Sequence, residues 1–414
     1  MFKRNIKKTL ESALFRSRVI LLNGARQVGK TTLMLEFVKN GYNYITFDDE
    51  ISYLAAKNNP VEFISKIEKP VIIDEVQRIP EIFLPIKRTV DLNQNPGKFL
   101  LTGSANPLLI PKLGDSLAGR MEIIDIFPLS QGEINGIQED FIDEIFGNFK
   151  IKQKLNYSKK ELYTKILTGG YPSVQNVTEE TFNSWMRNYL NLILQKDIKD
   201  LAQIEKITEM PNLLKILASR ASGLLNVAEI SRDAKMITKT THRYLALLET
   251  IFLINIQLPW SSNLTTRFIK TPKIYFLDSG LLSYILCHPE LDSGSSPLKA
   301  LIDNTLMGKI VENFVVNEIR KQATWNKKEI KIYHSRTTAG QEVDLILEDR
   351  AGNIVAIEVK NSEKIISDDF KGLKFLQEKL KTKFLRGIIL YTGSDVISFD
   401  KELYCVPIPA LWNM

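Results

Sequence analysis

The 414-residue sequence predicts an α/β fold in three parts: a parallel sheet with a phosphate-binding loop, a helical middle, and a second α/β part at the end. Three observations predict this fold. A glycine-bounded loop joins an apolar run to a helix near the N-terminus, short capped helices follow in the middle, and two alternating strands meet at a turn near the C-terminus. We expect the domains to span residues 1–150, 151–273 and 274–414, because the length exceeds one ordinary core.

Composition excludes several protein classes. With 44% hydrophobic and 25% charged residues, each part can fold as a globular domain. The two cysteines and three scattered histidines do not form a clustered zinc pattern or a disulfide framework. The chain has no run of eighteen apolar residues, and its basic start lacks the apolar block of a signal peptide. We therefore expect a cytoplasmic protein without membrane contact.

The first motif is a phosphate loop. Residues 24–31 fit the pattern G-x-x-x-x-G-K-[ST] and lie between the apolar run 19–22 and the helical segment 33–37. In such a loop backbone N–H groups surround the β-phosphate, the lysine reaches the β and γ oxygens, and the threonine hydroxyl binds Mg²⁺. An ordinary strand-to-helix turn is the alternative, which the flanking strand and helix disfavour. The residues expected to bind ATP are Gly24, Arg26, Gln27, Val28, Gly29, Lys30, Thr31 and Thr32, with Thr31 also a Mg²⁺ ligand.

A buried-strand run, residues 69–75, ends in two acids, Asp74 and Glu75. Asp74 is a candidate Mg²⁺ ligand, and Glu75 is a candidate for polarising the attacking water. Strands often end in an acid only because acidic residues favour the turn that follows a strand. Some forty residues after a phosphate loop, however, the pair predicts a nucleotide-hydrolysing site.

The next two strands supply further candidates. Thr102 or Ser104, more than Asn106, could sense the γ-phosphate or orient water at the carboxyl end of its strand, although turn chemistry explains them equally well. Arg120 precedes the following strand. It could stabilise transition-state charge, in its own chain or in a neighbouring subunit, or be an ordinary surface arginine.

Together these segments resemble a known family. The sequence is similar to the prokaryotic, archaeal-ATPase-like AAA-type P-loop ATPases in the motifs GARQVGKTT, FDDE, VIIDEVQRIP, LLTGS and SLAGR followed by FPLS. The C-terminal half of that family is a conserved domain of uncharacterised function. The resemblance covers nearly the whole chain. It implies an AAA-type ATPase fold with Lys30, Asp74 and Glu75 in the nucleotide site, and it suggests a homo-oligomer.

The middle part has the outline of a winged helix-turn-helix. Three helices are expected in residues 211–222, 226–236 and 238–254, with Asn226 and Thr238 as N-caps, and an extended stretch follows. The third helix would enter a DNA major groove. Its outward residues would be Lys239, Thr240, His242 and Arg243.

Local charge favours a nucleic-acid partner. The chain carries 55 Lys and Arg against 48 Asp and Glu, and residues 206–273 contain ten of the basic residues but only four acids. Such an excess favours nucleic acid through counterion release. The alternative is that the same fold docks proteins or spaces domains.

The tail carries a nuclease-like pattern. One strand places Glu342 and Asp344 on one face, a turn in residues 349–353 returns the chain, and the next strand places Glu358 and Lys360 on one face. This arrangement is that of the restriction-endonuclease-like PD-(D/E)xK fold, in which carboxylates hold Mg²⁺ and the lysine stabilises charge.

The nuclease pattern has one departure and one addition. Val343 stands where the motif has proline, and Glu312 on a preceding helix is a further candidate ligand, with a solvated helix acid as the alternative. A solvated, salt-bridged hairpin is the alternative. Inactive relatives can keep such carboxylates, so cleavage stays open.

The sequence thus indicates ATP hydrolysis coupled to the binding or processing of nucleic acid, with DNA expected. The rival is a nucleotide-dependent switch or scaffold whose winged helix and tail bind proteins and whose nuclease site is inactive. The substrate, the pathway and the oligomeric state are not indicated.

Overall fold

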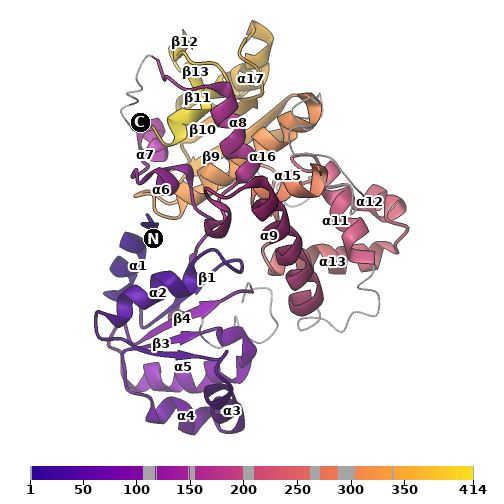
Figure 1. Cartoon of the computed structure of the whole chain (residues 1–414). Coiled ribbons are helices and arrows are strands. Elements are labelled where there is room, and N and C mark those ends of the chain that lie inside the picture. The colour runs from indigo at the N-terminus through magenta and orange to yellow at the C-terminus, as the bar shows by residue number, and fades with distance from the viewer. Residues whose placement is uncertain are drawn as a thin grey trace. The chain divides into compact units, whose positions relative to one another are not determined.

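A computed structural model describes residues 2–105, 117, 119–147, 149, 154–198, 209–261, 271–287, 304–337 and 340–413 (Figure 1). Internal contacts divide the chain into two compact units. One contains residues 1–129 with 246–253, and the other contains residues 130–245 with 254–414. The predicted division into three domains stays a prediction. No helix in the described ranges is both long enough and apolar enough to span a bilayer.

The first unit is built on a five-stranded parallel sheet with the strand order β2–β3–β4–β1–β5 (Figure 1). Strands β1, β3 and β4 are buried along their whole length, as expected for apolar strands covered on both faces. The strands are β1 Val19–Asn23, β2 Asn43–Thr46, β3 Val71–Asp74, β4 Phe99–Gly103 and β5 Met121–Asp125. The helices are α1 Lys7–Leu14, α2 Lys30–Val38, α3 Glu50–Asn58, α4 Pro60–Lys66 and α5 Phe83–Leu92.

The strand order decides where the predicted site forms. β1 leads into the phosphate loop, β3 ends in the acids, and β4 lies between these two strands. Because all three strands are parallel, their carboxyl ends lie at one edge of the sheet, where open α/β sheets bind ligands. Asn106 lies outside the described residues.

The second unit contains a six-stranded mixed sheet with the order β12–β13–β11–β10–β9–β8. Strands β8, β9 and β10 form an antiparallel meander, whereas β11 is parallel to both β10 and β13. Helix α17 packs on β9, β10 and β11, and helix α16 contacts β10. The elements are α16 Asn304–Ala323, β8 Ile330–Arg336, β9 Glu342–Asp349, β10 Ile354–Lys360, α17 Lys371–Leu380, β11 Phe384–Tyr391, β12 Ile397–Asp400 and β13 Leu403–Pro407.

Before this sheet come helices and one hairpin. The helices are α6 Gln131–Asn135, α7 Phe141–Phe146, α8 Lys159–Thr168, α9 Glu179–Leu192, α11 Met210–Ser219, α12 Val227–Asp233, α13 Thr238–Thr250 and α15 Ser279–Cys287. The hairpin pairs β6 Ile254–Gln257 with β7 Lys273–Phe276. The Asn226 side chain accepts a hydrogen bond from the backbone N–H of Glu229 at 3.3 Å, so the predicted N-cap of α12 is confirmed.

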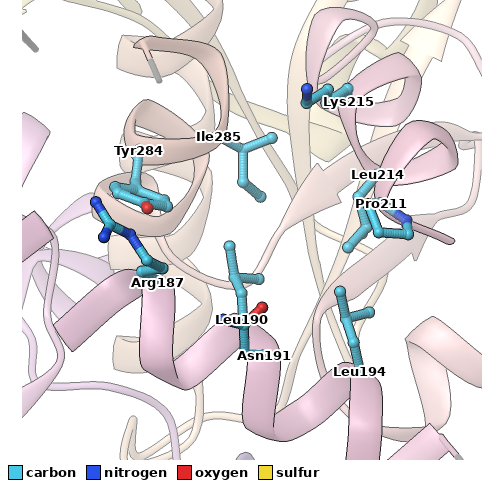
Figure 2. A pocket seen from close by; sticks show the side chains of 9 residues that line it. All are labelled: Arg187, Leu190, Asn191, Leu194, Pro211, Leu214, Lys215, Tyr284 and Ile285. Carbon is cyan, nitrogen blue, oxygen red and sulfur yellow. The ribbon is translucent and has the colours of Figure 1, made fainter. Parts of the chain in front are cut away.

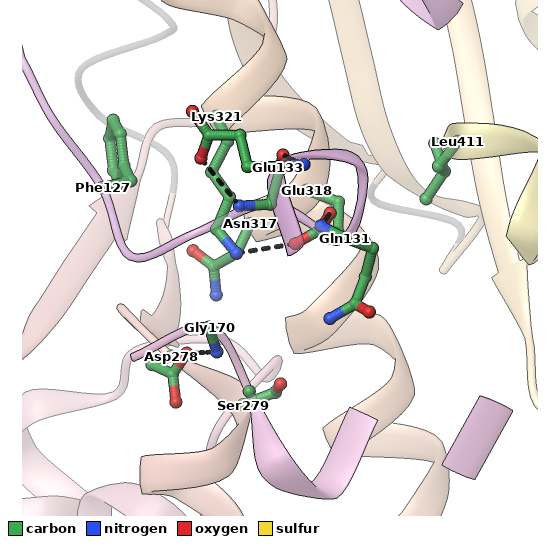
Figure 3. A network of polar contacts seen from close by, with 12 residues as sticks. Phe127, Gln131, Glu133, Gly170, Asp278, Ser279, Asn317, Glu318, Lys321 and Leu411 are labelled. Atoms are coloured by element: carbon green, nitrogen blue, oxygen red, sulfur yellow. Dashed lines mark hydrogen bonds and ion pairs between the residues drawn. The ribbon is translucent and has the colours of Figure 1, made fainter. Parts of the chain in front are cut away.

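Two short motifs, GGYP at residues 169–172 and LDSG at 277–280, are joined inside this unit (Figure 3). The buried Asp278 carboxylate accepts the N–H of Gly170 at 2.7 Å and that of Leu281 at 3.0 Å. A Cβ atom on Gly169 would lie 2.2 Å from Asp278 Oδ1, and one on Gly280 would lie 2.2 Å from the Thr168 carbonyl oxygen. Both glycines are therefore required by close packing.

Candidate functional site

The predicted phosphate loop lies between β1 and the first turn of α2. Gln27 and Gly29 have backbone φ angles of 61° and 97°. Phosphate-binding loops use such left-handed residues to turn backbone N–H groups toward an anion. A Cβ atom at Gly24 would lie 2.2 Å from the Ile126 carbonyl oxygen, so only glycine fits there. The N-terminus of α2 adds its partial positive charge to this anion-binding loop.

Lys30 begins α2 and is 5% exposed. Its ammonium group donates hydrogen bonds to the carbonyl oxygens of Gly24 at 2.9 Å and Ala25 at 2.8 Å. The cation therefore lies inside the loop that it would serve. Thr31 and Thr32 follow in the same helical turn, and Arg26 and Val28 belong to the loop.

Asp74 joins three hydroxyl groups at the end of β3. Thr31 Oγ1 donates to Asp74 Oδ2 at 2.8 Å, Tyr44 donates to the same oxygen at 2.7 Å, and Thr102 donates to Oδ1. Burial and the Asp74 carboxylate raise the pKa of the Tyr44 hydroxyl. The two predicted Mg²⁺ ligands, Thr31 and Asp74, are thus in direct contact.

Glu75 is held by a second polar group. Its φ of 59° is in the left-handed region, and its N–H donates to Thr102 Oγ1 at 3.1 Å. Its carboxylate accepts hydrogen bonds from Gln77 Nε2 and, at 3.1 Å, from Ser104 Oγ. Gln77 Nε2 also donates to Ser104 Oγ at 2.8 Å. Three side chains, those of Thr102, Gln77 and Ser104, therefore fix the position of this candidate base.

Arg4 anchors the loop from the N-terminal segment. It is 8% exposed, and its guanidinium donates to the carbonyl oxygens of Val28 and Phe127, each at 2.6 Å. A single side chain thus links the phosphate loop to the segment after β5. Arg4 therefore helps to fix the loop conformation.

Arg120 is not brought to this edge of the sheet. It immediately precedes β5, whose first residue pairs with Val19 at the amino end of β1. Five residues at about 3.3 Å each separate that level from the loop end of β1, or roughly 16 Å. The guanidinium of Arg120 pairs with Asp91 near the end of α5. Action on the phosphates of its own chain is therefore not supported by the geometry.

The nuclease-like residues of the second unit converge around a buried lysine. Lys273, the first residue of β7, is 1% exposed at its side chain. Its ammonium lies 2.9 Å from Glu312 Oε1, 2.6 Å from Glu342 Oε1 and 2.9 Å from Asp344 Oδ1. The other Asp344 oxygen accepts the N–H of Val359 at 3.0 Å. The predicted Asp344 thus meets a cation that the sequence pattern does not contain.

The second half of the pattern lies beside this cluster. Lys360 donates to Glu358 Oε1 at 3.0 Å and lies 3.6 Å from Asp369. Among the described residues, the buried Glu358 Oε2 has no hydrogen-bond partner. Burial and the nearby Asp344 charge raise the pKa of Glu358 well above its ordinary range.

Charge in the cluster is balanced by its own lysines. Burial and the Asp344 charge raise the pKa of Glu312 to about 8, and the Lys273 ammonium opposes this rise. Burial disfavours the Lys273 ammonium, but the surrounding acids outweigh it and the pKa of Lys273 lies well above its ordinary value. Lys273 therefore carries a full positive charge among these acids.

Comparison with known proteins assigns the first site to a family. Residues 16–135 match the family described as an AAA domain. The N-terminal part is an AAA-type P-loop ATPase-like domain. Residues 159–292 and 307–411 match two further families, each described as a domain of unknown function, DUF8612 and DUF4143.

Similar proteins extend the match beyond the AAA domain. The uncharacterized proteins Mb2031c of Mycobacterium bovis and Rv2008c of Mycobacterium tuberculosis are 29% identical over 362 residues, which is 87% of this chain and 74% of theirs. Among solved structures, the Walker-type ATPase PABY2304 of Pyrococcus abyssi overlaps with a TM-score of 0.42 at 17% identity, covering 69% of this chain and 96% of that one. AMPPCP-bound DnaA from Aquifex aeolicus overlaps at 0.28 and 17% identity, covering 59% and 85%. Scores this low carry no conclusion about fold or activity.

Sequence reasoning missed four residues that the structure brings to these sites. In the AAA domain they are Arg4, Tyr44 and Gln77, and in the second unit Lys273. Gln77 had a usable signal, because it lies two residues after Glu75 in the same segment. Lys273 had none, because it is 71 residues from Asp344 in the chain.

The predicted DNA-contacting residues lie on α13. Lys239, His242 and Arg243 are exposed and Thr240 is half-buried. Part of the local positive charge is neutralised, since Arg220 pairs with Glu229 and Asp233. Exposed cations on and beside α13 remain available for a partner.

A small pocket lies between α9, α11 and α15 (Figure 2). Its volume is about 510 Å³ including its opening to solvent. Figure 2 shows Leu190 of α9 and Leu194, two residues after the end of α9, pointing toward Ile285 and Leu214. None of the predicted site residues lines it.

Proposed function

We propose that the chain is an ATPase that couples ATP binding and hydrolysis to DNA binding. The observation that carries the proposal is the contact between Thr31 and Asp74, with Lys30 inside the loop and Glu75 beside Thr102. Lys30 and Thr31 begin α2, after the loop that follows β1, and Asp74 and Glu75 lie at the end of β3. All four therefore lie at the carboxyl edge of the sheet, where open α/β sheets bind ligands.

The residues fit ATP with Mg²⁺. The buried Lys30 ammonium donates to two carbonyl oxygens of the loop, and phosphate oxygens can replace these acceptors with a stronger, charge-assisted bond. Thr31 and Asp74 would hold Mg²⁺, which when bound neutralises charge on the β- and γ-phosphates. Tyr44 and Thr102 keep the Asp74 carboxylate oriented through their hydroxyl groups.

Glu75 would accept a hydrogen bond from the attacking water and polarise it. Its hydrogen bonds to Gln77 and Ser104 hold the carboxylate at the edge of the sheet, so the base is oriented before the reaction. Thr102 joins this base to Asp74, because it donates to Asp74 and accepts from the Glu75 N–H.

Two substitutions test the ATPase proposal. Lys30→Ala should lose ATP affinity, because no other ammonium lies inside the loop in the described part of the chain. Glu75→Gln should bind ATP normally while hydrolysis falls by about 10²–10⁴-fold, the usual contribution of a positioned base. Equilibrium binding of a labelled nucleotide and phosphate release measure the two effects. Normal ATP affinity in Lys30→Ala would remove the phosphate-loop assignment.

DNA binding is proposed for a winged helix formed by α11, α12, α13 and the β6–β7 hairpin. The element order and the exposed Lys239 and Arg243 support it. Filter binding of DNA across a salt series, combined with ATPase assays with and without DNA, tests the coupling. A flat salt dependence without DNA stimulation would favour the rival function of a nucleotide-dependent switch that binds proteins.

For the tail we propose a restriction-endonuclease-like arrangement of Asp344, Glu358 and Lys360. One observation favours the rival reading in which this site does not cleave. The Lys273 ammonium already lies among the carboxylates that a metal-dependent nuclease would use. A metal-dependent cleavage assay on DNA, with Asp344→Ala as the control, tests nuclease activity directly.

A further inference from the structure

We propose that Lys273 is a built-in cation that takes the place of a divalent metal in the carboxylate cluster of Glu312, Glu342 and Asp344. The inference uses the predicted nuclease-like arrangement of the tail but is independent of ATP hydrolysis. It assigns a role to a residue that no motif predicts.

The geometry of the ammonium is that of a central ion. Three carboxylate oxygens from two elements, α16 and β9, lie within 2.9 Å of Lys273 Nζ. An ammonium has three hydrogens, so three acceptors use its full donor capacity. The second Asp344 oxygen is already occupied by the Val359 N–H. These donors, as arranged, do not fit an additional divalent ion at the same point.

The strand that carries Lys273 is fixed on both sides. Its backbone neighbours pair with β6 on one side, and on the other the Ser222 N–H donates to the Ile274 carbonyl oxygen at 2.8 Å. Phe276 donates its N–H to Asn313 Oδ1 at 2.8 Å on α16. The position of the ammonium is therefore set by the backbone.

The extension of β6 is also tied to the edge of the six-stranded sheet. Trp260 donates its N–H to the His334 carbonyl oxygen at 2.6 Å, and His334 donates to the Leu258 carbonyl oxygen at 3.2 Å. The hairpin thus joins β8 through its own backbone. Backbone hydrogen bonds and ion pairs thus join Lys273 and the acids within one part of this unit, and the cation is built into the cluster.

The proposal predicts metal uptake only after the lysine is removed. Mn²⁺ alone is the probe, titrated calorimetrically into the full chain without nucleotide. Wild-type protein and Lys331→Ala, which removes an exposed lysine of β8, should take up no Mn²⁺ at the cluster. Lys273→Ala leaves three acids and open space, and should bind one Mn²⁺ per chain at least tenfold more tightly than any residual uptake by wild type. Adding Asp344→Asn to Lys273→Ala should abolish that uptake.

Two results would overturn the proposal. One is wild-type binding of Mn²⁺ that Asp344→Asn abolishes, because metal and ammonium would then coexist. The other is a folded Lys273→Ala protein that binds no Mn²⁺. Unchanged ATP hydrolysis in Lys273→Ala establishes folding of the AAA domain and keeps this test separate from the ATPase proposal.

A second test, with two substitutions that keep the net charge unchanged, applies if Lys273→Ala does not fold. Lys273→Met with Asp344→Asn removes one charge of each sign. If the lysine is the internal counter-ion, this double variant should recover at least half of the melting-temperature loss of Lys273→Met alone. A loss equal to or larger than that of the single variant overturns the proposal.

Discussion

At the scale of single residues, Glu75 depends on a neighbour for its orientation. Gln77 donates to its carboxylate and to Ser104, so the amide bridges a base and a hydroxyl. A hydrogen bond to a charged group contributes about 1.5–3 kcal/mol. The amide therefore holds the carboxylate of the proposed base in one place.

Gln77→Ala should lower kcat roughly tenfold, the equivalent of about 1.4 kcal/mol, and leave ATP affinity unchanged. The reason is that Gln77 positions the base without touching phosphate. Steady-state kinetics separate kcat from KM, and Gln77→Glu is the matched control that keeps size but reverses the polarity of the contact. A change in KM alone would mean that Gln77 supports nucleotide binding instead.

His334 makes the second unit sensitive to mild acid. Burial and the charge of Lys273 lower its pKa to about 3, whereas an unfolded histidine titrates near 6.5. Between these values the unfolded chain binds more protons than the folded chain, so stability falls as pH falls below about 6.5. We expect about 1.4 kcal/mol of lost unfolding free energy between pH 7.5 and pH 5.5 from this group.

Urea unfolding of wild-type protein and His334→Gln at these two pH values measures the effect. The variant should lose about 1.4 kcal/mol less than wild type over the interval. Equal pH dependence in both proteins would show that His334 is not held neutral in the folded state.

Single residues also show which parts of the two sites motifs can predict and which they cannot. The phosphate-loop residues and Asp74 were predictable because their spacing follows from phosphate chemistry. Arg4 and Lys273 were not, because each meets its partners through long-range packing. A lysine followed by apolar residues, as in residues 273–276, has the same pattern whether it is exposed or buried among acids.

At the scale of elements, α13 carries the DNA-binding proposal. Its two exposed cations, Lys239 and Arg243, are one helical turn apart and lie on neighbouring surface positions. If both touch phosphate, the double variant Lys239→Ala with Arg243→Ala should bind DNA more weakly. The slope of log affinity against log salt should then flatten by about two contacts.

Filter binding at several salt concentrations gives that slope. A variant in Lys331 of β8, which is exposed but outside α13, serves as the control and should keep the wild-type slope. An unchanged slope in the double variant would assign α13 to protein docking.

Element boundaries were largely predictable from the sequence. The apolar run at 19–22 became β1 at Val19–Asn23, and the expected tail hairpin became β9 and β10. Register and neighbours were not predictable. Nothing in the pattern of β7 indicates that it lies beside Glu312 of α16, because that placement depends on two chain segments meeting in three dimensions.

At the scale of the whole molecule, the position of Arg120 indicates that its predicted catalytic role would need a second copy of the chain. Within its own chain it lies at the amino edge of the sheet and pairs with Asp91. We therefore propose that any catalytic role of Arg120 is exerted on the nucleotide of a neighbouring subunit. The sequence contained this constraint, because a residue that precedes a parallel strand lies opposite the carboxyl edge.

Arg120→Ala should keep ATP affinity and slow hydrolysis by about 10³-fold or more, the usual contribution of an arginine supplied in trans. Mixing it with Lys30→Ala protein should restore activity, because one protein supplies an intact loop and the other an intact arginine. Phosphate release from the mixture, compared with each variant alone, measures this. No recovery in a mixture that forms oligomers would leave Arg120 as a surface residue paired with Asp91.

The close contact between GGYP and LDSG restricts which substitutions homologues of this chain can accept. Gly169 and Gly280 tolerate no side chain, and Asp278 is held by two backbone N–H groups that would lose their acceptor with it. A lineage that gave up ATP hydrolysis would be released from selection at Lys30 but not at these three positions. Retention of the two motifs in a distant homologue therefore reports shared architecture, whereas residues 24–31 and 74–75 are the ones from which its chemistry should be judged.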